Sequence, residues 1–237
     1  SINKKDLLIY IFRGFAHGAG VILWFYAMSR IPIAEVTAIS YTGPIYISIG
    51  AAIFFGEKLA LRRIIAIFIA FIGTLIILRP GFQEISTGQL AQIISAPLFA
   101  ISYLLSKELT KKHNSLVIVC MLSVFVTLIL APPALSVWVQ PSLKEILSLG
   151  IVAILATLGH ITLTQAIKSA PIIIIQPISF LQLVWATLIG YFIFSETVDI
   201  YVIVGGLVII VSVTYISYRE MKLNTVYKIP HNNLTKL

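Results

Sequence analysis

The sequence has little charge and almost no cysteine. Asp and Glu together number 9 of 237 residues, and charged residues make up 11% of the chain, against about 25% in a typical soluble domain. Cys120 is the only cysteine, which excludes disulfides and cysteine-based metal sites within one chain. So few charged residues are typical of a membrane protein.

Motifs for catalysis and metal binding are also missing. The sequence contains no His-Glu-x-x-His pair, no Gly-x-x-x-x-Gly-Lys loop and no acidic pair within an apolar run, which argues against an intramembrane enzyme. Of the four histidines, His113 is predicted in a loop and His231 in the tail. We therefore expect no catalytic residues, no metal site and no cofactor.

Long apolar runs dominate what is present. The chain is 59% hydrophobic and its mean hydropathy is +1.00. A bilayer-spanning helix needs about 20 mostly apolar residues. Eight runs meet this length, at roughly 8–29, 33–55, 63–79, 88–107, 115–137, 146–167, 171–194 and 200–218. The predicted fold class is an all-α integral membrane protein.

The distribution of positive charge predicts the orientation. With eight spans, both termini lie on one side, and that side carries all 17 Lys and Arg residues except Arg30, Arg79 and Lys144. Cytoplasmic loops of membrane proteins are enriched in Lys and Arg. We therefore expect a multi-pass protein of the plasma (inner) membrane with both termini in the cytoplasm.

The chain repeats itself at an offset of 139 residues. The repeat relates spans one to three to spans six to eight, whereas spans four and five have no upstream counterpart. The simplest expectation is a ten-span, five-plus-five inverted repeat whose first two helices are missing here. Residues 1–81 would then be the last three helices of the first repeat, 88–218 the complete second repeat, and 219–237 a disordered cytoplasmic tail. The paired positions are Gly20/Gly159, Ile22/Ile161, Ala27/Ala166, Pro32/Pro171, Ile33/Ile172, Ser40/Ser179, Phe55/Phe194 and Glu57/Glu196.

Short motifs occur in a fixed order along the first repeat. They are Arg13-Gly14, Tyr26-Ala27, Pro32 to Glu35, Pro44, Gly56-Glu57, Arg62-Arg63 and Arg79-Pro80-Gly81. The second repeat has Ala166, Pro171 and Ser195-Glu196, with Leu183 at the position of Pro44. This order resembles the EamA-type transporters of the drug/metabolite transporter superfamily. The resemblance implies a carrier with a central cavity that opens alternately to each side.

Polar residues inside the apolar runs are the candidate substrate contacts, because such residues usually face a cavity or a partner helix. Thr157, His160 and Thr164 share one helix face, and Pro177 can expose a backbone carbonyl. Hydrogen bonding between helices, a structural kink or simple packing would explain the same residues. The full set is His17, Trp24, Tyr41, Thr42, Tyr103, Thr157, His160, Thr164, Gln165, Gln176, Gln182 and Trp185.

Three acidic residues and two glycines are candidates for gating and for helix packing. Glu35, Glu57 and Glu196 lie near span ends, where they can act as gating charges, form turns or pair, as Glu35 can with Arg30. The glycines Gly14 and Gly18 are spaced for close helix packing.

The predicted function is a secondary transporter that moves a small metabolite or drug-like molecule by alternating access, most simply outward. The expected partners are that substrate, the lipid bilayer and a second copy in a homodimer, and we expect no nucleic acid. Basic residues are missing from the middle of the spans, which argues against strongly anionic substrates. The alternatives are a truncated, non-transporting or partner-dependent membrane protein and, third, an intramembrane enzyme.

Overall fold

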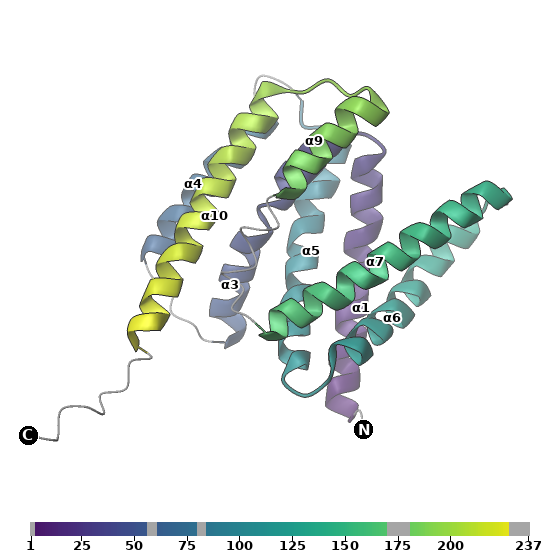
Figure 1. Ribbon diagram of the computed structural model, residues 1–237, viewed down its shortest axis with the longest axis horizontal. Helices are drawn as coiled ribbons and strands as arrows, with labels where there is room; N and C mark the ends of the chain where they lie inside the picture. Colours follow the sequence, from purple (N-terminus) through teal and green to yellow (C-terminus); the bar gives the residue numbers. More distant parts are fainter. Residues whose placement is uncertain (1–2, 56–60, 80–83, 170–180, 228–237) are drawn as a thin grey trace, which may run out of the picture.

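The computed structural model describes residues 3–55, 61–79, 84–169 and 181–227, and these residues form helices and connections without any strand. The predicted all-α class is therefore confirmed for this part of the chain (Figure 1). The helices are α1 (Lys4–Met28), α2 (Ile33–Ser40), α3 (Gly43–Phe55), α4 (Leu61–Leu78), α5 (Thr87–Thr110), α6 (Ser115–Ser136), α7 (Leu143–Ser169), α9 (Leu181–Phe194) and α10 (Ile200–Tyr227).

Several helices have the length and apolar surface that a bilayer requires. Within the described residues, 4 helices qualify, at Lys4–Met28, Thr87–Thr110, Ser115–Ser136 and Leu143–Ala166. Shorter apolar helices run over Ile64–Leu78, Val184–Phe194 and Ile200–Tyr215. Large apolar side chains point outward, including Phe12, which is 64% exposed, and Phe192, which is 74% exposed. Lipid rather than water is the solvent that suits such a surface.

The second predicted span is broken, which corrects the expectation of one continuous helix over 33–55. Helix α2 ends at Ser40, and α3 begins at Gly43 after a turn at Tyr41 and Thr42. The reason is Pro44, which has no N–H to donate to the carbonyl of Ser40 and whose ring would clash with that carbonyl in a continuous helix. The Thr42 hydroxyl donates to the Ile39 carbonyl at 2.8 Å, which satisfies one acceptor at the break.

The C-terminal boundary also differs from the expectation. Helix α10 continues through Arg219 to Tyr227, so this part of the expected disordered tail is helical. Residues 228–237 lie outside the described residues, as do residues 170–180 at the start of the predicted seventh span. Helix α1 begins and α10 ends on the same side of the bundle (Figure 1), here called the N-terminal side.

The bundle is organised around α1, which packs against α5 and α6. Gly14 and Gly18 permit the contact with α6, because added Cβ atoms would meet Phe125 and Ile129. The prediction that these glycines serve close helix packing is confirmed. On the other flank α4 packs along α10, α3 lies on α5, and α2 contacts α5, α9 and α10.

Equivalent positions of the repeat meet where α4 crosses α10. A Cβ on Gly73 would lie 2.8 Å from the Gly205 carbonyl, and the Ser212 hydroxyl donates to the Ala66 carbonyl. Adding 139 to 66 and 73 gives 205 and 212, so each contact is the exchanged counterpart of the other. This is the relation that a two-fold axis between repeats would create.

Candidate functional site

Polar and aromatic side chains of three helices meet where α1, α5 and α7 come together. The rings of His17 on α1 and His160 on α7 lie 5.4 Å apart between centroids. Ser102 Oγ on α5 is 3.2 Å from His17 Nδ1, and the Phe99 ring is 5.1 Å from the His17 ring. We call His17, Phe99, Ser102 and His160 the central cluster.

The antiparallel packing of α1 and α5 positions this cluster. The Ser95 hydroxyl donates to the Gly20 carbonyl at 2.9 Å, and Ser102 meets His17 about two turns further along α5. Gly20 leaves room for Phe99, since an added Cβ would lie 3.2 Å from its ring. The imidazoles and the hydroxyl can donate and accept hydrogen bonds, and the aromatic rings can stack on a planar ligand.

Arg13 is a buried cation one helical turn from His17. Its side chain lies between helices rather than in a loop, Arg13 is 5% exposed, and its Nη1 donates to the Ile118 carbonyl at 2.9 Å. By sequence alone, Arg13 counts with the Lys and Arg residues of the loops on the N-terminal side. The structure corrects this, because Arg13 is buried between helices. The available signal was an arginine within an apolar run, which marks a functional candidate.

The other predicted contacts are dispersed. Tyr41 is buried in the core beside Ile39, Trp24 packs near Val36 and Ala91, and Thr164 is buried with its hydroxyl on the His160 carbonyl at 2.7 Å. Tyr103 is half-buried on α5. The exposed residues are Thr157, Gln165, Gln182 and Trp185. The Gln165 side-chain oxygen accepts a hydrogen bond from the Ser115 hydroxyl at 3.0 Å. Gln176 and Glu57 lie outside the described residues.

Thr42 faces a separate cavity. A space of about 540 Å³ lies among α3, α4 and α5, and among the described residues that line it Thr42, Tyr46 and Thr74 carry hydroxyl groups. The rest of the lining is aliphatic or phenylalanine. The cavity therefore suits an apolar molecule or chain more than a polar one.

Polar contacts hold the helix ends on the side opposite the N-terminal side. The Glu196 carboxylate accepts the backbone N–H of Ile33 at 3.0 Å, which joins α2 to the segment after α9. Gln89 Nε2 donates to Glu35 at 2.6 Å, while the Arg30 guanidinium lies 3.6 Å from the centroid of the Tyr26 ring. Glu35 therefore bonds to α5 through Gln89.

An ion pair adds to this group. Arg79 at the end of α4 pairs with Asp199 before α10 at 2.6 Å. Together, the contacts of Glu196, Glu35 and Arg79 form what we call the far-side contacts. They join α2 to α5 and to the segment after α9, and the end of α4 to the start of α10.

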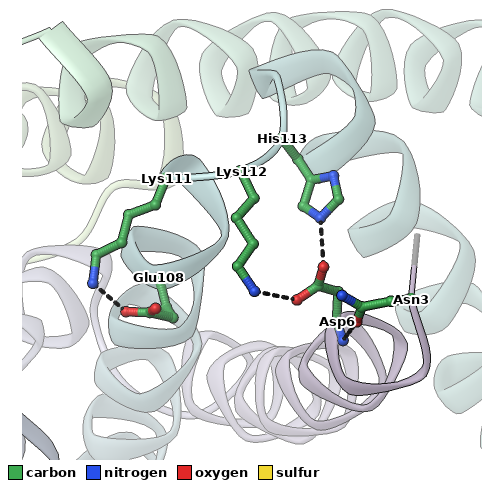
Figure 2. A network of polar contacts seen from close by, with 6 residues as sticks. All are labelled: Asn3, Asp6, Glu108, Lys111, Lys112 and His113. Atoms are coloured by element: carbon green, nitrogen blue, oxygen red, sulfur yellow. Dashed lines mark hydrogen bonds and ion pairs between the residues drawn. The ribbon is translucent and has the colours of Figure 1, made fainter. Parts of the chain in front are cut away.

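A second polar network lies on the N-terminal side. Figure 2 shows the Asp6 carboxylate of α1 between Lys112 and His113 of the turn that joins α5 to α6, at 2.9 and 3.2 Å. Asn3 caps α1 by accepting the Asp6 N–H at 2.8 Å. Asp6 is 2% exposed although both partners come from a loop. The network therefore fixes the start of α1 against the α5–α6 turn.

The described residues hold no group of three or more His, Cys, Asp or Glu side chains placed to bind a metal ion. The central cluster instead offers hydrogen bonds, aromatic faces and, through Arg13, one positive charge. Such a set suits reversible binding of a small organic molecule.

Known proteins were compared with this chain. The model of the EamA-like transporter family matches residues 1–79 and 86–218. The S-adenosylmethionine uptake transporter of Rickettsia bellii is 26% identical over 222 residues, which cover 94% of this chain and 76% of that protein. The riboflavin transporter of Brucella anthropi is 28% identical and covers 93% of this chain and 80% of its own length.

The pseudopaline exporter CntI of Pseudomonas aeruginosa is 24% identical, over 90% of this chain and 75% of that protein. A crystal structure described only as that of a protein aligns with a TM-score of 0.57 at 16% identity, over 92% of this chain and 90% of that one. This last likeness concerns the fold alone.

Proposed function

The chain belongs to the EamA-like transporter family, and on that premise we propose that it is a secondary transporter which carries a small metabolite across the plasma membrane by alternating access. The related proteins are named for the transport of small molecules. The observation that carries the proposal is the central cluster, where His17, Ser102 and His160 gather between apolar helices. Polar groups inside a membrane cost free energy unless a partner or a ligand compensates them.

In this proposal the substrate binds between α1, α5 and α7. His17 and His160 lie 143 positions apart in the sequence, and neither belongs to the packed apolar core. Phe99 supplies an aromatic face, and Tyr103 lies one turn further along α5. Thr164 is buried one turn beyond His160 on α7 and is proposed to border the site. Trp24 is partly buried beside Val36, and Tyr41 lies in the core cluster of Ile39, so their contact with the substrate stays a prediction.

The two polar networks fit alternating access. A carrier of this kind opens one side while the other is closed, and bistable contacts at the helix ends can alternate. The far-side contacts close one end, with Glu196 and Glu35 as gating residues. The Asp6 network closes the start of α1 on the other end. Glu57, equivalent to Glu196 by the offset of 139, is proposed to serve the opposite mouth.

The five-plus-five arrangement is part of the same proposal. Helix α1 is covered by α5 and α6, whereas its repeat equivalent α7 presents apolar residues such as Ile151 and Leu155 that are 61% and 64% exposed. In a ten-span inverted repeat, a helix pair equivalent to α5 and α6 would cover α7 and α9. Both termini lie in the cytoplasm in this arrangement, and the outward direction of transport stays a prediction.

The test is transport by the purified protein in sealed liposomes, with radiolabelled S-adenosylmethionine and riboflavin as the first probes. A transporter gives saturable movement of at least one probe or of another small metabolite in a wider screen. His160→Ala should raise the KM about tenfold, the usual result of losing one polar contact to a ligand. Thr162→Ala is the matched control, because Thr162 is exposed on the same helix and its hydroxyl donates to the Leu158 carbonyl of that helix at 2.9 Å.

If no small molecule in the screen moves, the non-transporting alternative replaces this proposal. If saturable transport keeps its KM in His160→Ala, the chain is a transporter whose site lies elsewhere.

A further inference from the structure

Three buried hydrogen-bond donors lack a partner between α1 and α5. They are the Tyr10 hydroxyl, Arg13 Nε and the Ser106 hydroxyl, and none has a hydrogen-bond partner within the part of the chain that the structure describes. Tyr10 is 1% exposed, Arg13 5% and Ser106 3%. An unpartnered buried polar group costs about 1–3 kcal/mol, so three together call for an explanation.

The helix register puts the three donors on neighbouring turns of α1 and α5. Along the antiparallel pair, Gly20 lies opposite Ser95 and His17 opposite Ser102. The same register, continued for one turn, places Arg13 opposite Ser106, and one further turn brings Tyr10 to Leu109, with which it shares an apolar cluster. From this register we infer that the donors lie one to two turns from the central cluster.

The chemistry of the three groups matches an anion. Arg13 Nε–H is a donor only, and both hydroxyls can donate. The nearest acidic residue along α1 is Asp6, which already binds Lys112 and His113. On α5, Glu108 pairs with Lys111, and His17 and His160 supply no negative charge. A buried guanidinium without a carboxylate is costly, and a bound oxyanion would pair with its charge.

We propose that Tyr10, Arg13 and Ser106 bind the carboxylate of the transported molecule. This inference rests on the proposed transport function and names its substrate class, an organic acid or zwitterion. His17 lies four residues from Arg13, about 6 Å along the helix axis, so the remainder of the molecule would reach the rings of the central cluster. A single carboxylate is compatible with the expectation from sequence, which argues only against strongly anionic substrates.

The first test is the melting temperature of the purified protein as sodium acetate replaces sodium methanesulfonate at constant ionic strength. Acetate should raise the melting temperature saturably, because a ligand that binds only the folded state stabilises it. Ser106→Ala and Tyr10→Phe should each raise the apparent Kd for acetate about tenfold, the effect of losing one hydrogen bond to a charged group. Arg13→Gln should abolish the saturable response.

Ser95→Ala is the matched control on the same interface, since the Ser95 hydroxyl is already bonded to Gly20. Its acetate Kd should equal that of the wild type. Without acetate, Ser106→Ala should melt no lower than the wild type, because the removed hydroxyl has no partner in the described protein. The proposal fails if the acetate response is not saturable, or if Ser106→Ala and Ser95→Ala respond alike.

A second arm separates a substrate carboxylate from a free anion of the same chemistry. Acetate should inhibit transport competitively in liposomes, and Ser106→Ala should weaken that inhibition. Equal stabilisation by chloride with no inhibition of transport would overturn the assignment to a substrate carboxylate. Acetate binding without transport of any probe would overturn the proposed function and leave the anion site standing. Saturable transport without an acetate response would overturn the site alone.

Discussion

Glu196 illustrates how one residue joins distant parts of the chain. Its backbone N–H donates to the Gly190 carbonyl at 2.9 Å, which closes the end of α9. Its carboxylate accepts the N–H of Ile33, the first residue of α2. Gly190 makes this possible, because a Cβ there would contact the Glu196 carboxylate. A negative charge at a helix N-terminus is favourable for the helix dipole as well.

The Glu196 contact can be tested by two substitutions. Glu196→Ala removes the acceptor for Ile33 and should lower the free energy of unfolding by about 1–2 kcal/mol. Glu196→Gln keeps one acceptor oxygen but loses the charge and should cost about half as much. Thermal unfolding in detergent measures both, with the exposed neighbour Thr197→Ala as the control. Equal stability of all three variants would show that the contact does not hold the two helices together.

At the scale of the element, close helix crossings depend on residues without side chains. On α4, Gly73 lies against the backbone of α10, where an added Cβ would come within 2.8 Å of the Gly205 carbonyl and 3.2 Å of the Ile209 nitrogen. Backbone atoms cannot rotate away as a flexible side chain can. The crossing distance of α4 and α10 is therefore set by Gly73 and Gly205.

Gly73→Ala should accordingly destabilise the protein by about 1–3 kcal/mol, the usual cost of overpacking. Gly150→Ala is the matched control on α7, because nothing lies within 4 Å of an added Cβ there. That change should be neutral or should stabilise by up to about 1 kcal/mol through helix propensity. Chemical denaturation in mild detergent compares the two, and a Gly73→Ala protein as stable as Gly150→Ala would contradict the close crossing.

At the scale of the whole molecule, polar contacts are concentrated at the two ends of an apolar bundle. One end has Asp6 with Lys112 and His113, and the other has the far-side contacts. Between them lies the central cluster. This arrangement gives a carrier two separate places at which closure can be strengthened or released without changing the site itself.

The topology gives a prediction for the complete protein in a bacterial inner membrane. Green fluorescent protein fused after α10 should fluoresce, and alkaline phosphatase at the same point should stay inactive, because the side rich in Lys and Arg is expected to face the cytoplasm. Fusions within the segment before Ile200 should give the opposite pattern. Active phosphatase after α10 would show that the orientation is the opposite of the predicted one, with the Asp6 network facing away from the cytoplasm and the far-side contacts facing it.

Some of the site was accessible to sequence reasoning. His17 and His160 stood out because polar residues within apolar runs are conspicuous, and Gly14 and Gly18 because their spacing is that of close-packed helices. Arg13 was visible as an arginine within a run, but its burial depended on how far α1 extends beside α5 and α6. The break before Pro44 was visible as a proline, but proline alone does not determine whether a helix bends or ends.

The apolar helices, their approximate positions and their fit to a bilayer can be read from the sequence, because these properties depend on the length and composition of local segments. Which polar groups meet depends on the tertiary structure. The contact of His17 with His160 and the bond of Glu196 to Ile33 depend on the rotation and register of helices far apart in the chain. The rotation and register of a helix are set by packing against neighbouring helices, and the sequence of a single apolar run does not show which helices those are.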